Sequence, residues 1–227
     1  MFMKCPICNS CSNVFSEKHP FFKGFPLLIC KNKLCEHCWC PNPEPYSDVE
    51  LHHKSFKKKQ RQRASNHVNI ISEHFPNLKS ILEMGPTQHF YFIKKISELF
   101  PESEKYIYDI ADLSEKCPKN VIFLQEIDTN LNVDIIYSSH SLEHVPNVNW
   151  IMKKFLQISN NFLIEVPTKK REELFFYKKE NKLMDIVGIH HHIFSMKSVE
   201  LFFNKFNLNK KEIYTNKIGN TCWILKS

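Results

Sequence analysis

Glycine is scarce in this chain, which has four glycines in 227 residues, whereas ordinary usage is about 7%. Long apolar runs are also missing, since none approaches the roughly 20 residues that a bilayer-spanning helix needs. The first ten residues, MFMKCPICNS, place cysteines where a secretory signal would have its apolar region. These absences argue against a membrane partner and predict a cytoplasmic protein.

The composition is that of a globular protein with a basic balance. Hydrophobic residues make up 42% of the chain, and its length suffices for one α/β domain plus a small module. Lysine and arginine number 31 against 24 acidic residues, a formal net charge of +7. This charge suits nucleic acid, nucleotide-linked sugars or phosphorylated substrates, but a general compositional bias explains it equally well.

Cysteines are concentrated at the N-terminus, with seven of the nine in the first 40 residues. Two C-x-x-C knuckles, a spacing that lets two thiolates share one tetrahedral ion, predict a structural zinc site with Cys5, Cys8, Cys35 and Cys38 as ligands. Cys30 is an alternative to Cys38. Disulfides and inert buried thiols are the competing interpretations, and a reducing cytoplasm argues against the disulfides.

Proline and charge patterns divide the chain into three segments. The sequence PNPEP at 41–45 cannot continue a helix or a central strand, so residues 1–45 are predicted to form the zinc-binding module. Residues 46–78 form a linker with one helix over about 50–75, and residues 79–227 form the main domain. The basic stripe of this helix, over 57–63, fits a solvated face better than a phosphate-binding surface.

Short apolar runs alternate with helical patterns after residue 79, which predicts an α/β fold with a parallel sheet. The expected strands cover 80–84, 106–109, 121–124, 134–138 and 162–166, and the expected helices cover 89–100 and 148–158. Residues 208–214 and 221–226 read as a closing antiparallel pair. Ligands of such sheets bind at the carboxyl ends of the strands.

The run from Ile81 to Pro86, ILEMGP, is similar to the first cofactor motif of class I S-adenosylmethionine-dependent methyltransferases. The resemblance implies that Glu83, Gly85, Pro86 and Thr87 bind S-adenosylmethionine (SAM). Thr87 and His89 stand where the family has further glycines.

Later motifs follow in the order that the family has. Asp109 ends the second strand, where a carboxylate bridges the ribose hydroxyls, and Glu126 with Ile127 matches the segment that reads the adenine. The fourth strand leads through Ser139 and His140 into Leu-Glu-His-Val at 142–145. The resemblance covers about residues 79–207 and implies a Rossmann-like class I methyltransferase sheet with a small N-terminal zinc-ribbon module.

Three histidines are candidates for proton removal. Sugar C-methyltransferases with N-terminal zinc modules have a similar histidine-rich segment followed by Phe-Ser, and a histidine after the fourth strand. The resemblance implies catalytic roles for His144, His190 and His192, while the family's intervening glutamate is His191 here. Histidine suits this task because its pKa lies near neutrality. A surface loop or fortuitous metal binding is the competing interpretation.

These observations predict a SAM-dependent methyltransferase that methylates oxygen or carbon of a small-molecule or sugar (glycan-precursor) acceptor, with SAM and structural Zn²⁺ as cofactors. An RNA methyltransferase is a second hypothesis; the +7 charge favours it, and the lack of an Asn-Pro-Pro-Tyr-type motif after strand four opposes it. A third hypothesis, motivated by Thr87 and His89, is a non-catalytic binding protein with a methyltransferase fold.

Overall fold

The computed structural model describes residues 3–20, 22, 24–41, 57–87, 89–183, 190–215 and 220–227. The chain divides into two compact units. Unit 1 comprises Met1–Pro45, His140–Lys153 and Ile164–Ser227, and unit 2 comprises Tyr46–Ser139 and Lys154–Leu163.

Unit 2 contains a run of parallel strands. They are β4 (Ser80–Met84), β5 (Glu104–Tyr108), β6 (Ile122–Leu124) and β7 (Ile135–Ser139). Met84 of β4 lies opposite both Tyr108 of β5 and Ser138 of β7, and Tyr108 lies opposite Leu124 of β6. Because the strands are parallel and in register, their carboxyl ends meet at one edge of the sheet.

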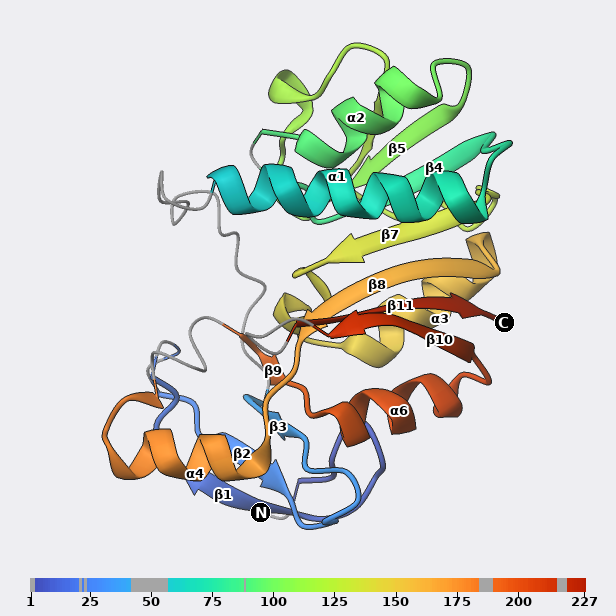
Figure 1. Ribbon diagram of the computed structural model, residues 1–227. Coiled ribbons are helices and arrows are strands. Elements are labelled where there is room, and N and C mark those ends of the chain that lie inside the picture. Colours follow the sequence, from blue (N-terminus) through green and yellow to red (C-terminus); the bar gives the residue numbers. More distant parts are fainter. Residues whose placement is uncertain are drawn as a thin grey trace. The chain divides into compact units, whose positions relative to one another are not determined.

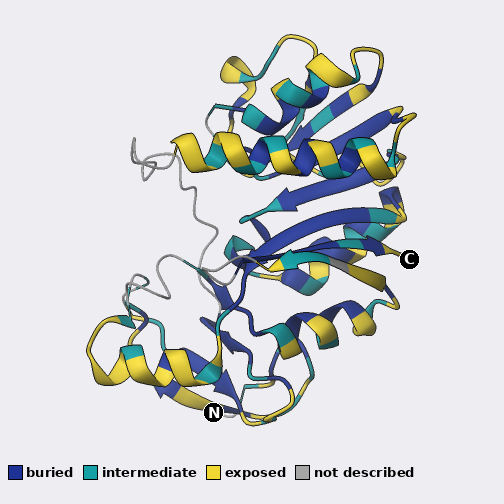
Figure 2. Ribbon diagram, viewed as in Figure 1, coloured by how far each residue is buried: buried dark blue, intermediate teal, exposed yellow. Residues whose placement is uncertain are grey.

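Two helices accompany these strands, α1 (Lys57–His74) and α2 (Tyr91–Leu99), and they contact each other (Figure 1). The buried His67 of α1 forms a hydrogen bond of 2.9 Å between its Nδ1 and the hydroxyl of Tyr137 in β7. The basic residues at the start of α1 are mostly exposed, whereas the strands are largely buried (Figure 2). The helix therefore packs through one face, as the 3.6-residue periodicity requires.

Unit 1 contains a small antiparallel sheet built from both ends of the chain. Its order is β1 (Ser12–Ser16), β2 (Leu27–Cys30), β3 (Cys38–Trp39) and β9 (His192–Ile193). Cys38 lies opposite Ile193, and Trp39 lies opposite His192. The histidine-rich segment thus supplies the last strand of the cysteine-rich module, which the sequence did not predict.

Unit 1 also contains short helices and a pair of strands. They are η3 (Leu142–His144), α4 (Arg171–Lys179), α6 (Met196–Lys205), β10 (Asn209–Thr215) and β11 (Asn220–Lys226). β10 and β11 pair antiparallel, as predicted. The Ser195 hydroxyl accepts a hydrogen bond from the amide of Ser198 at 3.0 Å, so Ser195 is the N-cap of α6.

Helix α3 (Val148–Ile158) and strand β8 (Asn161–Pro167) have residues in both units. The strand order of the central mixed sheet is β10-β11-β8-β7-β4-β5-β6. This confirms the predicted α/β class, a Rossmann-like methyltransferase sheet with a small N-terminal sheet beside a cysteine cluster.

Most predicted elements agree with the structure to within two residues. The strand at 80–84 and the helix at 148–158 are found with the same bounds. The sequence missed α4, and residues 50–56 of the predicted linker helix lie outside the described residues.

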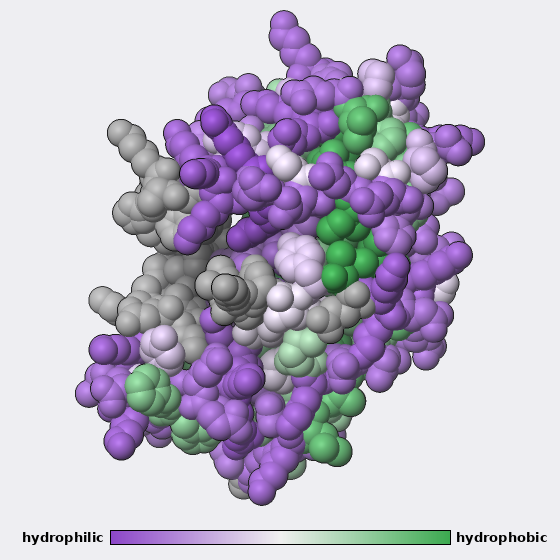
Figure 3. All heavy atoms as spheres, viewed as in Figure 1, coloured by the Kyte–Doolittle hydropathy of each residue, from purple (hydrophilic) through white to green (hydrophobic). Residues whose placement is uncertain are grey.

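Among the described helices, none is both long and apolar enough to cross a membrane. The face drawn in Figure 3 is mostly hydrophilic.

The burial of β4 generates a stability prediction. Ile81 has no solvent exposure, so Ile81→Ala should lower the free energy of unfolding by about 2–5 kcal/mol through lost burial and a cavity. Ile122, in β6, is 52% exposed, so Ile122→Ala should change it by less than about 1 kcal/mol. Urea unfolding of both variants measures the difference, and equal losses would contradict the assignment of β4 to the core.

Candidate functional site

The predicted cofactor residues lie at the carboxyl edge of the unit 2 strands. Gly85 directly follows β4, Asp109 follows β5, and Ser139 ends β7. The amide of Gly85 donates a hydrogen bond of 2.9 Å to the carbonyl of Tyr108, and the amide of Asp109 donates one of 3.3 Å to the carbonyl of Leu124. The residue after each strand is therefore hydrogen-bonded to the neighbouring strand at this edge.

Two carboxylates at this edge are held in an unusual environment. Glu83 is buried, and its Oε2 accepts no hydrogen bond from the part of the chain that the structure describes. Burial, and secondarily the charge of Asp109, raises the pKa of Glu83 to about 8. Burial also raises the pKa of Asp109, whose Oδ1 accepts a hydrogen bond from the amide of Ala111 at 2.8 Å.

The loop after β4 adopts two left-handed backbone conformations. Gly85 has φ 64° and Phe90 has φ 53°, and the amide of Phe90 donates to the carbonyl of Thr87 at 2.9 Å. Pro86 and Thr87 lie in this loop, and the buried Thr87 hydroxyl has no hydrogen-bond partner among the described residues. A glycine at 85 is needed because other residues adopt this backbone at a cost.

The predicted adenine segment follows β6 at the same edge. Glu126 is exposed and Ile127 is half-buried. The charge of Glu126 contributes to raising the pKa of Tyr108, after burial and Asp109, so these groups are close enough to interact.

A cluster of histidines and carboxylates lies in unit 1. Glu143 is fully buried, and its Oε1 lies 3.5 Å from Nδ1 of His140 and 4.0 Å from Nε2 of His190. The rings of His144 and His190 are 4.9 Å apart, edge to face. Nε2 of His140 also lies 3.7 Å from Oε2 of the buried Glu165.

The structure therefore brings together the predicted residues His140, His144 and His190. Glu143 and Glu165 were not predicted as site residues, although Glu143 lies in the Leu-Glu-His-Val motif and Glu165 in the expected strand at 162–166. Tyr214 was missed as well; its hydroxyl donates a hydrogen bond to Oε1 of Glu165 at 3.0 Å. Burial lowers the pKa of His190 to about 3, against the opposing charge of Glu143, so His190 is neutral near pH 7.

His192 occupies a different environment from the other two catalytic candidates. Its Nδ1 is 3.0 Å from Nε2 of His37, and its Nε2 is 3.3 Å from the carbonyl of Pro146. Both nitrogens are engaged, which favours a structural role for this strand residue. The intervening His191 is buried and stacks on Phe22, with ring centroids 4.4 Å apart.

Four cysteines of unit 1 form a compact group. The sulfurs of Cys5, Cys8, Cys30 and Cys35 all lie within 4.8 Å of one another. The Cys5–Cys35 separation is 3.8 Å and the Cys8–Cys30 separation is 3.5 Å. Tetrahedral Zn–S bonds of about 2.3 Å would place sulfurs about 3.8 Å apart, so this donor set fits zinc.

This group differs from the predicted ligand set at one position, because Cys30 stands in place of Cys38. Cys30 ends β2, and its amide donates to the carbonyl of His37 at 2.8 Å, which closes the hairpin that carries Cys35. Cys38 lies in β3, and its side chain packs in the apolar cluster with Ile29 and Ile193. Cys38 lies opposite Ile29 of β2 and shares its face of the sheet, whereas Cys30, the next residue of β2, faces the other way.

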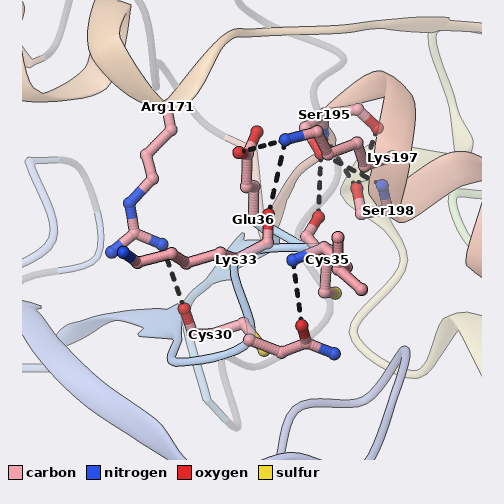
Figure 4. Close-up of polar contacts among 10 residues, drawn as sticks. Cys30, Lys33, Cys35, Glu36, Arg171, Ser195, Lys197 and Ser198 are labelled. Atoms are coloured by element: carbon pink, nitrogen blue, oxygen red, sulfur yellow. Dashed lines mark hydrogen bonds and ion pairs between the residues drawn. The ribbon is translucent and has the colours of Figure 1, made fainter.

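The C-terminal helices of unit 1 bind the loops that carry these cysteines (Figure 4). Arg171 of α4 donates to the carbonyl of Cys30 at 3.2 Å, and the Ser195 hydroxyl donates to the carbonyl of Cys35 at 2.9 Å. Lys197 of α6 pairs with Glu36 at 2.7 Å. In metal sites, hydrogen bonds around the ligating residues help to orient the ligands.

The raised pKa of Glu83 generates a pH prediction. Between its ordinary pKa of 4.5 and about 8, the folded carboxyl keeps a proton that the unfolded chain releases. The stability of the wild type should therefore fall as pH rises through this window. Glu83→Gln has no such proton.

The stability of Glu83→Gln relative to wild type should consequently rise with pH, by up to about 1.4 kcal/mol per pH unit. Urea unfolding of both proteins between about pH 5 and pH 9 measures this difference. A pH-independent difference would show that the Glu83 carboxyl titrates alike in the folded and unfolded states.

Comparisons with known proteins agree with the fold described above. The family model described as a methyltransferase domain, Methyltransf_23, matches residues 56–213. No curated protein matches the chain by sequence.

Several solved structures have a similar fold at low identity. The plantazolicin methyltransferase BpumL, in complex with a monoazolic desmethylPZN analog and SAH, has a TM-score of 0.59 and 12% identity over 79% of this chain and 89% of that chain. An O-methyltransferase family protein from Burkholderia thailandensis has a TM-score of 0.57 and 12% identity over 76% of this chain and 58% of that chain.

PigF with SAH has a TM-score of 0.53 and 13% identity over 73% of this chain and 56% of that chain. These likenesses support the fold, and the family match covers more than half of the chain. The chain therefore belongs to the Methyltransf_23 family and is a methyltransferase of the SAM-dependent class.

Proposed function

We propose that this protein transfers the methyl group of SAM to an oxygen or carbon atom of a small-molecule acceptor, with a sugar or glycan precursor as the favoured class. The observation that carries the cofactor part is the strand edge where Glu83, Gly85 and Asp109 lie together. Support for a sugar acceptor comes from the sequence resemblance of the histidine-rich segment and the following Phe194 and Ser195.

The residues at the strand edge fit SAM chemically. The buried Glu83 has a carboxylate oxygen without a hydrogen-bond partner among the described residues, which an ammonium group could satisfy. Asp109 follows the neighbouring strand, and its carboxylate can accept two hydrogen bonds from a diol. Pro86, Thr87, Glu126, Ile127, Ser139 and His140 complete the proposed set. When bound, SAM supplies an electrophilic methyl group on a sulfonium.

On the acceptor side, we propose that His144 and His190 contact the acceptor. These histidines are partly exposed, and they lie beside two buried carboxylates, Glu143 and Glu165, which can stabilise a positive charge on a histidine. A histidine of this cluster then receives the proton that the acceptor loses. Orientation contributes most of the rate, because methyl transfer is an in-line displacement.

We propose further that Cys5, Cys8, Cys30 and Cys35 hold a structural Zn²⁺, within a module that spans residues 1–45. A linker over 46–78 then leads to the methyltransferase domain at 79–227. The backbone beside two of these cysteines has a shared geometry that supports this site. A residue in the left-handed conformation follows each of them, Asn9 with φ 61° after Cys8 and Glu36 with φ 57° after Cys35.

The cofactor proposal predicts that Asp109→Ala weakens binding of S-adenosylhomocysteine by about 10- to 100-fold, because charge-assisted hydrogen bonds to the ribose are lost. Isothermal titration calorimetry measures this change. Asp112→Ala is the matched control, since Asp112 is an exposed aspartate three residues further along the same loop, and its affinity should match the wild type. Equal affinity in all three proteins would exclude Asp109 from the site.

The zinc proposal predicts different outcomes for two cysteine variants. Cobalt bound by thiolates gives an intense charge-transfer absorption, which reports the cysteine site alone. Cys30→Ser should lose about a quarter of this absorption or bind cobalt more weakly, because one of four thiolates is missing. Cys38→Ser should keep the wild-type spectrum. The reverse pattern would favour the ligand set predicted from the sequence.

A further inference from the structure

Glu143 is a carboxylate enclosed by protein. Its side chain has no solvent exposure, and neither oxygen accepts a hydrogen bond from the residues that the structure describes. Imidazole nitrogens of His140 and His190 lie 3.5 and 4.0 Å from its Oε1. An ionised carboxylate is costly to bury unless a cation or hydrogen bonds compensate it. The geometry around Glu143 therefore suits a bound cation.

Two imidazoles converge with this carboxylate. One ligand atom each of Glu143, His144 and His190 lies within 4.8 Å of the other two, the same limit that the four cysteines meet. Glu143 and His144 are neighbours in the η3 turn, while His190 comes from the segment that leads into β9. Two imidazole nitrogens and a carboxylate form a ligand set typical of transition metals with open coordination positions.

We propose that Glu143, His144 and His190 bind a divalent transition-metal ion, with Zn²⁺ as the expected occupant. Imidazole nitrogens suit this class of ion, whereas Mg²⁺ and Ca²⁺ take oxygen ligands. Three protein ligands leave a position for an oxygen atom, in contrast to the closed site that four cysteines form. The two sites are thus chemically distinct.

A metal ion at this site could take part in the proposed reaction. An acceptor hydroxyl could fill the open position, and a bound cation favours loss of its proton. His144 and His190 would then hold the ion, and His140, which lies outside the ligand group and beside Glu143 and Glu165, would receive the proton. This use rests on the proposed function, whereas binding of the ion does not.

Metal counting tests the proposal. The purified protein is dialysed against excess Zn²⁺ and then against buffer, and zinc per chain is measured by mass spectrometry. We expect two ions in the wild type and one in both Glu143→Gln and His190→Gln. His74→Ala is the matched control, because His74 is an exposed histidine at the end of α1, and it should keep two.

X-ray absorption identifies the ligands of the second ion. Glu143→Gln, with only the cysteine site filled, should show sulfur neighbours at about 2.3 Å, and the wild type should show nitrogen and oxygen neighbours at about 2.0–2.1 Å in addition. Sulfur neighbours alone in the wild type, or two zinc ions in Glu143→Gln, would overturn the proposal. Calorimetry with S-adenosylhomocysteine is carried out on the same wild-type protein. If this protein binds two zinc ions but no S-adenosylhomocysteine, the proposed function is contradicted while the proposed metal site is not.

Discussion

The parallel pairing of β4 with β5 and β7 is the constraint on which the cofactor edge depends. These three strands run in the same direction, so the residues that follow each strand lie at the same edge of the sheet. No local sequence motif is needed to bring these residues together. All five residues of β4 are buried, and Glu83 is among them. The raised pKa of Glu83 is therefore a consequence of its place in a central strand, and the same burial leaves a carboxylate oxygen available to a ligand.

Pairing of β9 with β3 has a comparable effect in unit 1. It fixes His192 opposite Trp39 and engages both nitrogens of that histidine. Successive residues of an extended segment point in different directions, so His190 can join Glu143 while His191 stacks on Phe22. One short segment therefore serves the N-terminal sheet and the histidine cluster at once.

The two metal sites that we propose in unit 1 arise in different ways. The spacing of cysteines in the sequence predicted three of the four members of the cysteine group. The group of Glu143, His144 and His190 joins residues more than 40 positions apart, and no spacing rule connects them. Its carboxylate was recognisable only as the second residue of a Leu-Glu-His-Val motif.

The sequence by itself determined the α/β class, the succession of strands along the chain and the acidic residues near the strand ends, because these depend on periodicity and on local turns. It determined Cys5, Cys8 and Cys35 as members of one group for the same reason. The tertiary structure decided the choice of Cys30 over Cys38, since side chains alternate along β2 and Cys38 packs with Ile29 in an apolar cluster on the opposite face from Cys30. It also decided which histidines meet carboxylates, because that depends on strand pairing between distant segments.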